Sequence, residues 1–106
     1  ILRSVSKTKR VLVLDIGHKS FGISSEIIAK VSEKLGKKLK YNPERIALPD
    51  IPTPTTYALA KNYYPTKKDI CKKIFKMLGK KMKVDRVLFK EDKYSDQPFK
   101  EFTGPF

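Results

Sequence analysis

The chain has 106 residues, with 24 Lys or Arg against 11 Asp or Glu, a formal net charge of +13 and an isoelectric point near 9.9. This length allows one domain with one modest core, and no apolar run approaches the roughly 20 residues of a membrane-spanning helix. A lone cysteine excludes an internal disulfide and suits a reducing compartment, and one cysteine with one histidine cannot supply a zinc site of the usual spacing.

The first predicted elements are a helix, a strand and a turn. Residues 1–8, ILRSVSKT, indicate the last turn or two of a helix. The run of leucines and β-branched residues from Val11 to Leu14 is typical of a strand buried on both faces. Gly17 and Gly22 then mark a turn into a second helix.

The second helix is predicted from an apolar stripe at four-residue spacing. The stripe consists of Ile27, Ile28, Val31, Leu35 and Leu39. Ser24 and Ser25 suit the start of this helix as capping hydroxyls, and Glu26 places a carboxylate near the positive end of the helix dipole.

The next segments are a short strand, a long irregular stretch and a third helix. ERIALP indicates a strand that ends at Pro49, which in the order helix, strand, helix, strand implies parallel pairing. Residues 49–70, PDIPTPTTYALAKNYYPTKKDI, fit neither helix nor strand over most of their length. Thr66 and Asp69 have capping-box spacing and open a helix with an apolar stripe of Ile70, Ile74 and Leu78.

Gly79 is predicted to cap that helix at its C-terminus. We expect one domain over residues 1–79 and a C-terminal extension over residues 80–106. Within the extension, VDRVLFKED indicates a short strand, and an extended aromatic tail follows. Two or three strands are too few to cover a parallel sheet, so the chain is expected to be part of a larger α/β unit.

Few residues suggest chemistry. His18 can act as a general base, but no serine or cysteine with an orienting acid lies near it in the sequence. Cys71 lies in the apolar stripe of the last helix, where a thiol acts as a small hydrophobe. Asp15 and Glu26 are the best-placed acids, with turn capping and dipole compensation as the alternative role. The sequence therefore predicts no catalytic, cofactor-binding or metal site in this chain.

The net charge of +13 is compatible with a binding role or with a simple solvated surface. A strongly basic chain can bind nucleic acid, an anionic membrane surface or an acidic protein. However, 20 of its 24 basic residues are lysines, whereas bidentate recognition of bases and phosphates favours arginine. We expect a solvated lysine surface, with a small basic nucleic-acid-binding module as the alternative function.

Two motifs in order, VLVLDIGHKSFGISSEIIAKV and then PDIPTPTTYALAKNYYPTKKDI, resemble the transketolase C-terminal domain. The resemblance is to the form found in β subunits of thiamine-diphosphate-dependent 2-oxoacid dehydrogenases of the pyruvate and branched-chain type. It covers roughly residues 2–78. Asp15, Gly17, Gly22 and Glu26 fall on the first motif as turn and cap residues. The second motif carries the expected interface residues Asp50, Pro52, Pro54, Tyr57, Leu59, Tyr63 and Tyr64.

The resemblance implies a three-layer α/β/α domain with a mostly parallel sheet, of which this chain holds the later part. It also implies that the domain serves subunit contacts in an oxidoreductase, while other domains bind thiamine diphosphate and Mg. The implied partners are an α-type decarboxylase subunit, a second β subunit and a lipoyl acyltransferase core, in the cytoplasm or the mitochondrial matrix. No membrane or specific nucleic acid is expected as a partner. A transketolase or deoxyxylulose-phosphate synthase domain is the related alternative.

Overall fold

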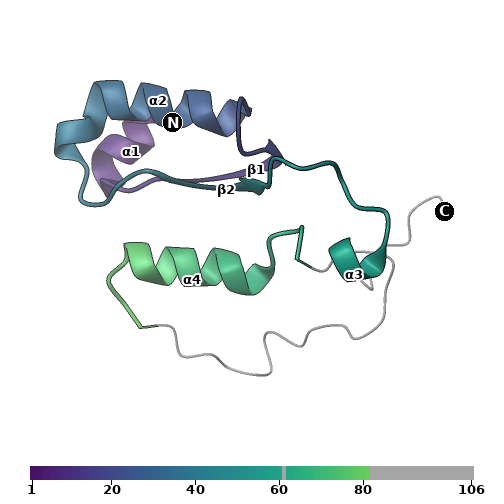
Figure 1. The fold of residues 1–106 in the computed structure, drawn as a ribbon. Helices are drawn as coiled ribbons and strands as arrows, with labels where there is room; N and C mark the ends of the chain where they lie inside the picture. The colour runs from purple at the N-terminus through teal and green to yellow at the C-terminus, as the bar shows by residue number, and fades with distance from the viewer. Residues whose placement is uncertain (61, 82–106) are drawn as a thin grey trace.

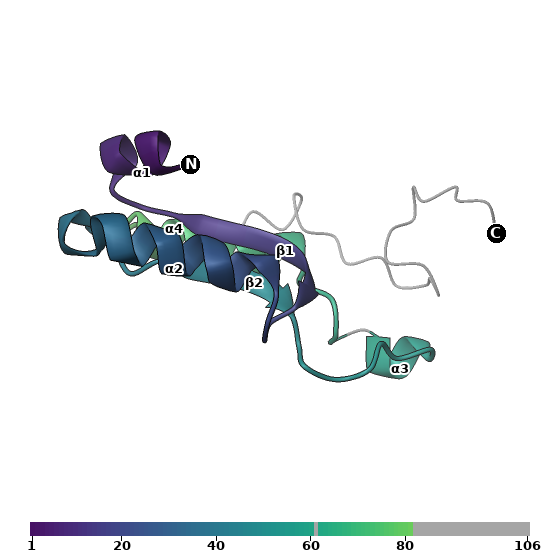
Figure 2. The same ribbon diagram turned by 90° about the horizontal axis from the view of Figure 1, so that it is seen from above.

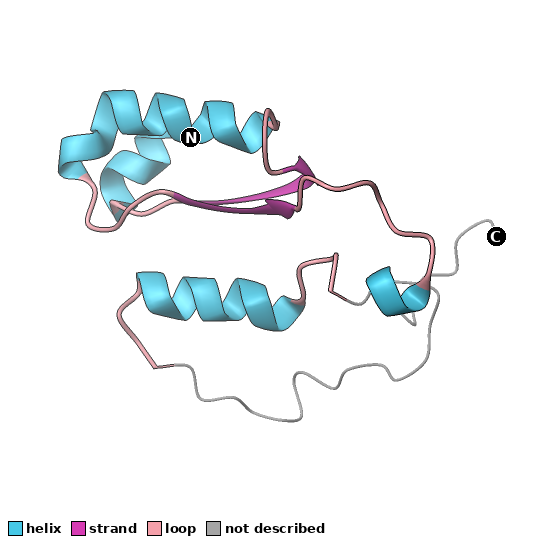
Figure 3. Ribbon diagram, viewed as in Figure 1, coloured by secondary structure: helices cyan, strands magenta, loops and turns pink. Residues whose placement is uncertain are grey.

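The computed structural model describes residues 1–60 and 62–81. In chain order the elements are α1 (Leu2–Thr8), β1 (Leu12–His18), α2 (Ile23–Leu35), the 3-10 helix η1 (Gly36–Lys38), β2 (Glu44–Leu48), α3 (Tyr57–Ala60) and α4 (Lys67–Met77) (Figures 1 and 3). Among these, no helix has both the length and the apolar character needed to cross a bilayer. The strand and the aromatic tail predicted within residues 80–106 fall on positions 82–106, outside the described residues.

The described strands form a parallel pair between two helical layers. Leu12 lies opposite Glu44 and Leu14 opposite Ile46, with an irregularity between Leu14 and His18. Helix α2, with α1 beside it, lies on one side of the pair, and α4 lies on the other side (Figures 1 and 2). This arrangement confirms the predicted α/β fold class, as a partial domain with parallel pairing.

Strand β1 is open on one face. Leu14 is 54% exposed and Ile16 is 94% exposed, whereas Val13 and Asp15, which alternate with them, are half-buried. Side chains alternate between the faces of a strand, so the exposed pair marks one uncovered face. The prediction of a strand buried on both faces is wrong for this chain, because the described residues leave the face that carries Leu14 and Ile16 largely uncovered.

Helix α2 is capped from a distance. Its N-cap residue is Gly22, which has no side chain to offer. The N–H of Ser24, the second helical residue, donates instead to Oδ2 of Asp15 at 2.9 Å. The prediction that a serine hydroxyl caps this helix is therefore wrong. Glu26 lies in the first turn, where its carboxylate pairs with Lys30 at 3.2 Å.

Helix α4 carries both predicted caps. Thr66 Oγ1 accepts from the N–H of Asp69 at 3.2 Å, and Asp69 Oδ2 accepts from the N–H of Thr66 at 3.0 Å. At the other end Gly79 has φ +66°, and the N–H of Lys80 donates to the carbonyl of Phe75 at 3.0 Å. These bonds form a capping box and a Schellman motif.

The core is small and distributed over the layers. Its buried apolar residues are Val5, Val31, Tyr63 and Met77. Arg10 Nε donates to the carbonyl of Met77 at 2.8 Å, which ties the end of α4 to the chain just before β1. Ile74 and Leu78, predicted as the stripe of this helix, are 41% and 47% exposed. Met77, rather than these two, supplies the buried contact.

The proline-rich stretch contains more regular structure than predicted. Residues 57–60 form the single-turn helix α3, closed by the N–H of Ala60 donating to the carbonyl of Thr56 at 2.9 Å. No proline lies between Pro54 and Pro65, so the intervening residues can reach helical backbone angles. The chain then returns toward the sheet and enters α4 (Figure 1).

Candidate functional site

The carboxyl end of β1 is organised by Asp15. Its Oδ1 accepts from the N–H of Gly17 at 3.0 Å and its Oδ2 from the N–H of Ser24 at 2.9 Å. These hydrogen bonds hold the pKa of Asp15 below its usual range, and the charge of Arg45 acts in the same direction. An ionised carboxylate with both oxygens engaged is suited to holding a turn and a helix terminus.

Gly22 is required by this arrangement. A Cβ atom at this position would lie 2.5 Å from the carbonyl oxygen of His18 and 3.1 Å from Oδ2 of Asp15. Contact with a backbone oxygen at that distance cannot be relieved by moving a side chain. The turn from β1 to α2 therefore depends on a glycine here.

The same turn is fastened to the start of the proline-rich loop. Asp50 accepts two hydrogen bonds from Ser20, from the N–H to Oδ1 at 2.7 Å and from Oγ to Oδ2 at 2.6 Å. His18 Nδ1 lies 2.9 Å from the carbonyl of Pro49, so this nitrogen must carry the proton and donate. The N–H of Lys19 donates to the carbonyl of Leu48 at 2.7 Å. We call these contacts, between residues 18–20 and 48–50, the latch.

The latch favours a charged Asp50. The hydrogen bonds from Ser20 hold the pKa of Asp50 below its usual range, and the nearby His18 and Lys19 lower it further. The carboxylate therefore keeps its two bonds to Ser20 at neutral pH. The latch fixes the direction in which the chain leaves β2.

Tyr63 holds the two arms of the loop together. Its side chain is 3% exposed, and its hydroxyl lies 3.2 Å from Thr53 Oγ1 and 3.5 Å from the carbonyl of Ile51. Its ring meets that of Tyr64 edge to face, with centroids 5.0 Å apart. We expected Tyr63 on an interface, but in this fold it packs inside the loop.

The outer side of the loop carries exposed apolar groups. Leu59 is 68% exposed, Ile51 55% and Tyr64 39%, and Pro52 is also exposed. We call these four residues the loop surface. Among the other predicted interface residues, Asp50 belongs to the latch and Pro54 is half-buried. Tyr57 begins α3, and its side chain lies outside the described part of the molecule.

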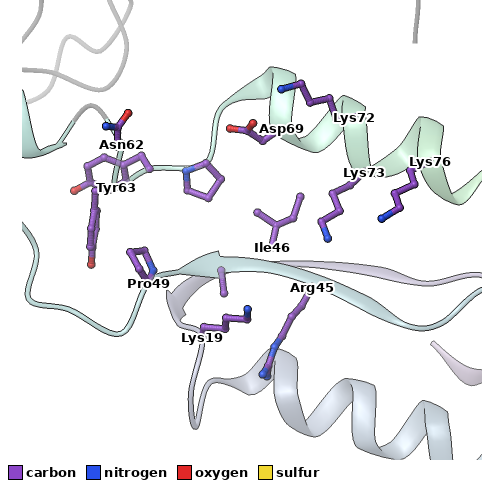
Figure 4. A pocket seen from close by; sticks show the side chains of 13 residues that line it. Lys19, Arg45, Ile46, Pro49, Asn62, Tyr63, Asp69, Lys72, Lys73 and Lys76 are labelled. Carbon is purple, nitrogen blue, oxygen red and sulfur yellow. The ribbon is translucent and has the colours of Figure 1, made fainter. Parts of the chain in front are cut away.

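A groove runs beside β2 and α4 (Figure 4). Its volume is about 610 Å³. Five basic residues line it, against one acid, Asp69; they are Lys19, Arg45, Lys72, Lys73 and Lys76. Lys73 is paired with Glu44, and this hydrogen bond holds the pKa of Glu44 below its usual range. The lining also includes Ile46 and Pro49, so the groove is both basic and apolar.

The latch brings His18, Ser20 and Asp50 close together, but no hydrogen bond among the described residues joins the histidine to the serine, because Ser20 Oγ donates to Asp50 instead. His18 contacts a backbone carbonyl, and Cys71 is half-buried on α4. Among residues 1–60 and 62–81, no three His, Cys, Asp or Glu side chains gather closely enough to hold a metal ion.

Sequence reasoning missed the roles of Ser20, Arg45 and Tyr63. Arg45 donates to Ser25 Oγ on the α2 side of the sheet. The two-residue alternation of a strand could have placed Arg45 there, on the face opposite Ile46. No local signal pairs Ser20 with Asp50, or Tyr63 with Thr53, since these partners are 30 and 10 residues apart.

Comparison with known proteins agrees with this fold. The family model for the transketolase C-terminal domain matches residues 1–70. The mitochondrial pyruvate dehydrogenase E1 component subunit beta of Chaetomium thermophilum is 36% identical over 78 residues, which are 74% of this chain and 20% of that protein. The pyruvate dehydrogenase E1 component subunit beta of Mycoplasma pneumoniae is 44% identical over 54 residues, 51% of this chain and 16% of that protein. The protein of the same name from Porphyra purpurea is 43% identical over 51 residues, 48% of this chain and 15% of that protein. The chain thus spans about a fifth or less of the length of these curated relatives.

Proposed function

Because the chain belongs to the transketolase C-terminal domain family, we propose that it is the assembly domain of the β-type subunit of a 2-oxoacid dehydrogenase. The relatives named pyruvate dehydrogenase E1 subunit beta support this choice over a transketolase or a nucleic-acid-binding module. The complete enzyme would carry out oxidative decarboxylation of a 2-oxoacid with thiamine diphosphate. We place the domain boundary near residue 79, at the cap of α4.

The observation that carries the assembly role is the exposed loop surface on an anchored loop. The latch and Tyr63 fix the backbone of the loop before any partner arrives, so little conformational freedom is left to lose on docking. Tyrosine, proline and leucine then offer rigid apolar area with one polar tip. The proposed partners are an α-type decarboxylase subunit, a second β-type subunit and a lipoyl acyltransferase core. The compartment would be the cytoplasm or the mitochondrial matrix.

The described residues do not fit the cofactor. They include no cluster of three metal-ligating side chains for Mg, and the best-placed carboxylate, Asp15, is occupied by two backbone N–H groups. Cofactor binding by other domains of the enzyme is what the family resemblance implies, and we derive no chemical step for this chain.

The assembly role is tested by truncating the loop surface. The double variant Leu59→Ala, Tyr64→Ala is made in the β-type subunit that carries this domain, and its association with the α-type subunit is measured by sedimentation. Truncating an interface anchor costs about 2 kcal/mol or more, which is roughly a 30-fold loss of affinity. The control Lys37→Ala, Lys38→Ala changes two exposed residues of η1 and is expected to leave association unchanged. Unchanged association of the loop variant, together with a lower melting temperature, would refute the assembly role.

A further inference from the structure

Within residues 1–60 and 62–81, the outer edge of β2 is unpaired. The N–H of Glu44 donates to Val11, and the carbonyl of Leu48 accepts from Lys19, so these groups point toward β1 and its flanking residues. In a parallel pair, alternate residues of a strand direct their backbone groups to opposite sides. The N–H and carbonyl groups of Arg45 and Ala47 therefore point outward. Within the described part of the chain, no third strand pairs with this edge.

Basic side chains flank this edge on both faces of the sheet. Figure 4 shows Lys73 and Lys76 reaching from α4 toward β2, while Lys19 and Arg45 lie on the α2 side of the same strand. Lys19, Lys72 and Lys76 are exposed and form no salt bridge with the described residues. An added strand at this edge would therefore have positively charged side chains on both faces of the sheet.

The acids near the groove are already engaged. Asp69 belongs to the capping box of α4, Asp50 to the latch, and Glu44 is paired with Lys73. Lys19, Lys72 and Lys76 lie near these acids and lower their pKa values, but they form no salt bridge with them. Five cations line the groove against these three acids, so positive charge is in excess there. An incoming ligand that carries carboxylates on both sides of an extended backbone would neutralise this excess.

We propose that the edge of β2 binds an acidic, extended peptide segment of a partner protein as an added strand. Backbone hydrogen bonds to Arg45 and Ala47 would hold the segment, and its acidic side chains would meet the lysines on both faces. The five residues of β2 span ~16 Å at about 3.3 Å per residue, which sets a bound length of about five residues. Ile46 and Pro49 in the lining offer apolar contacts to a side chain of the segment. This site does not depend on the proposed function, because its geometry lies entirely within the chain.

The test uses the full chain and a fluorescein-labelled peptide, Glu-Asp-Val-Glu-Asp-Glu, in fluorescence anisotropy at about 50 mM salt, where charge interactions are weakly screened. A second peptide replaces the central valine with proline, which removes a backbone donor but keeps every charge. We expect saturable binding of the first peptide and a loss of roughly tenfold or more for the second. Hydrogen exchange at the amides of Arg45 and Ala47 should slow when the first peptide is bound.

Two protein variants complete the test. The triple variant K19E, K72E, K76E reverses the groove charge and should weaken binding at least tenfold. The matched variant K34E, K37E, K38E makes the same change in net charge on exposed lysines of α2 and η1, and should retain binding. No binding of the first peptide would overturn the proposal. Three other results would also overturn it, because each would show nonspecific attraction of polyanions. The proline peptide could bind equally well, or both triple variants could weaken binding equally. Heparin could also displace the first peptide with no change in hydrogen exchange at the amide of Ala47.

Discussion

Replacing Tyr63 should loosen the whole proline-rich loop. A buried tyrosine removes about 150–250 Å² from water. At about 25 cal/mol per Å² this corresponds to roughly 4–6 kcal/mol as an upper bound. Because the loop can close partly around the gap, we expect Tyr63→Ala to lower the free energy of unfolding by about 3 kcal/mol.

The hydroxyl contributes a separable part of that effect. Tyr63→Phe keeps the ring but removes the contacts with Thr53 and the carbonyl of Ile51, and should cost about 1 kcal/mol. For a domain of this size, about 1 kcal/mol shifts the melting temperature by roughly 4–8 °C. We therefore expect a fall of about 4–8 °C for Tyr63→Phe and a fall about three times as large for Tyr63→Ala.

The matched control is Tyr64→Phe. The hydroxyl of Tyr64 makes no hydrogen bond within the described part of the chain, and its side chain is 39% exposed, so its removal should leave the melting temperature nearly unchanged. Melting is followed by circular dichroism, and hydrogen exchange at the amides of Ile51 and Ala60 reports on the loop itself. If Tyr63→Ala melts within a degree or two of this control, Tyr63 does not hold the loop together.

Three further predictions concern the turns and caps. Gly22→Ala should destabilise the fold, because the new methyl group would lie 2.5 Å from a carbonyl oxygen, and chemical denaturation should show a lower midpoint with an unchanged slope. Thr66→Ala removes one half of the capping box of α4 and should cost about 1 kcal/mol in the same assay, whereas Thr66→Ser should cost little. The pKa values of Asp15 and Asp50 are lowered in the folded state, so their contribution to stability is present above the ordinary aspartate pKa and is lost as pH falls through the folded pKa. Melting temperature should therefore fall steadily below about pH 4, and Asp50→Asn should reduce that fall; a pH profile identical to that of the unmodified chain would contradict the role given to the latch.

Local patterns accounted for most of the regular structure. The capping box at Thr66 and the left-handed glycine at Gly79 were both predicted from the sequence, because each involves residues no more than a few positions apart. The strand at the start of the first motif and the parallel pairing followed from composition and element order. The family was identified from motifs whose residues are contiguous in the chain.

The candidate site was less accessible to this reasoning. The sequence predicted Asp15 as a turn and cap residue, but it could not show which N–H groups this carboxylate accepts from, or that Asp50 holds Ser20. It placed Tyr63 on an outer surface, whereas the fold turns this ring inward against Thr53. It also did not predict α3, since a single helical turn is too short to show the apolar periodicity by which a helix is recognised.

By itself, the sequence determined where β1, β2, α2 and α4 form and how α4 begins and ends, because helix periodicity, strand alternation and caps depend on neighbours along the chain. Only the tertiary structure decided which side chains met, because the parallel sheet brings the turn at residues 18–20 against residues 48–50. The tertiary structure also decided which apolar side chains are exposed. Leu14 is an apolar residue of the kind found in cores, yet its side chain is 54% exposed. Burial depends on what packs against a strand, and that is a property of the assembled layers rather than of the strand's own residues.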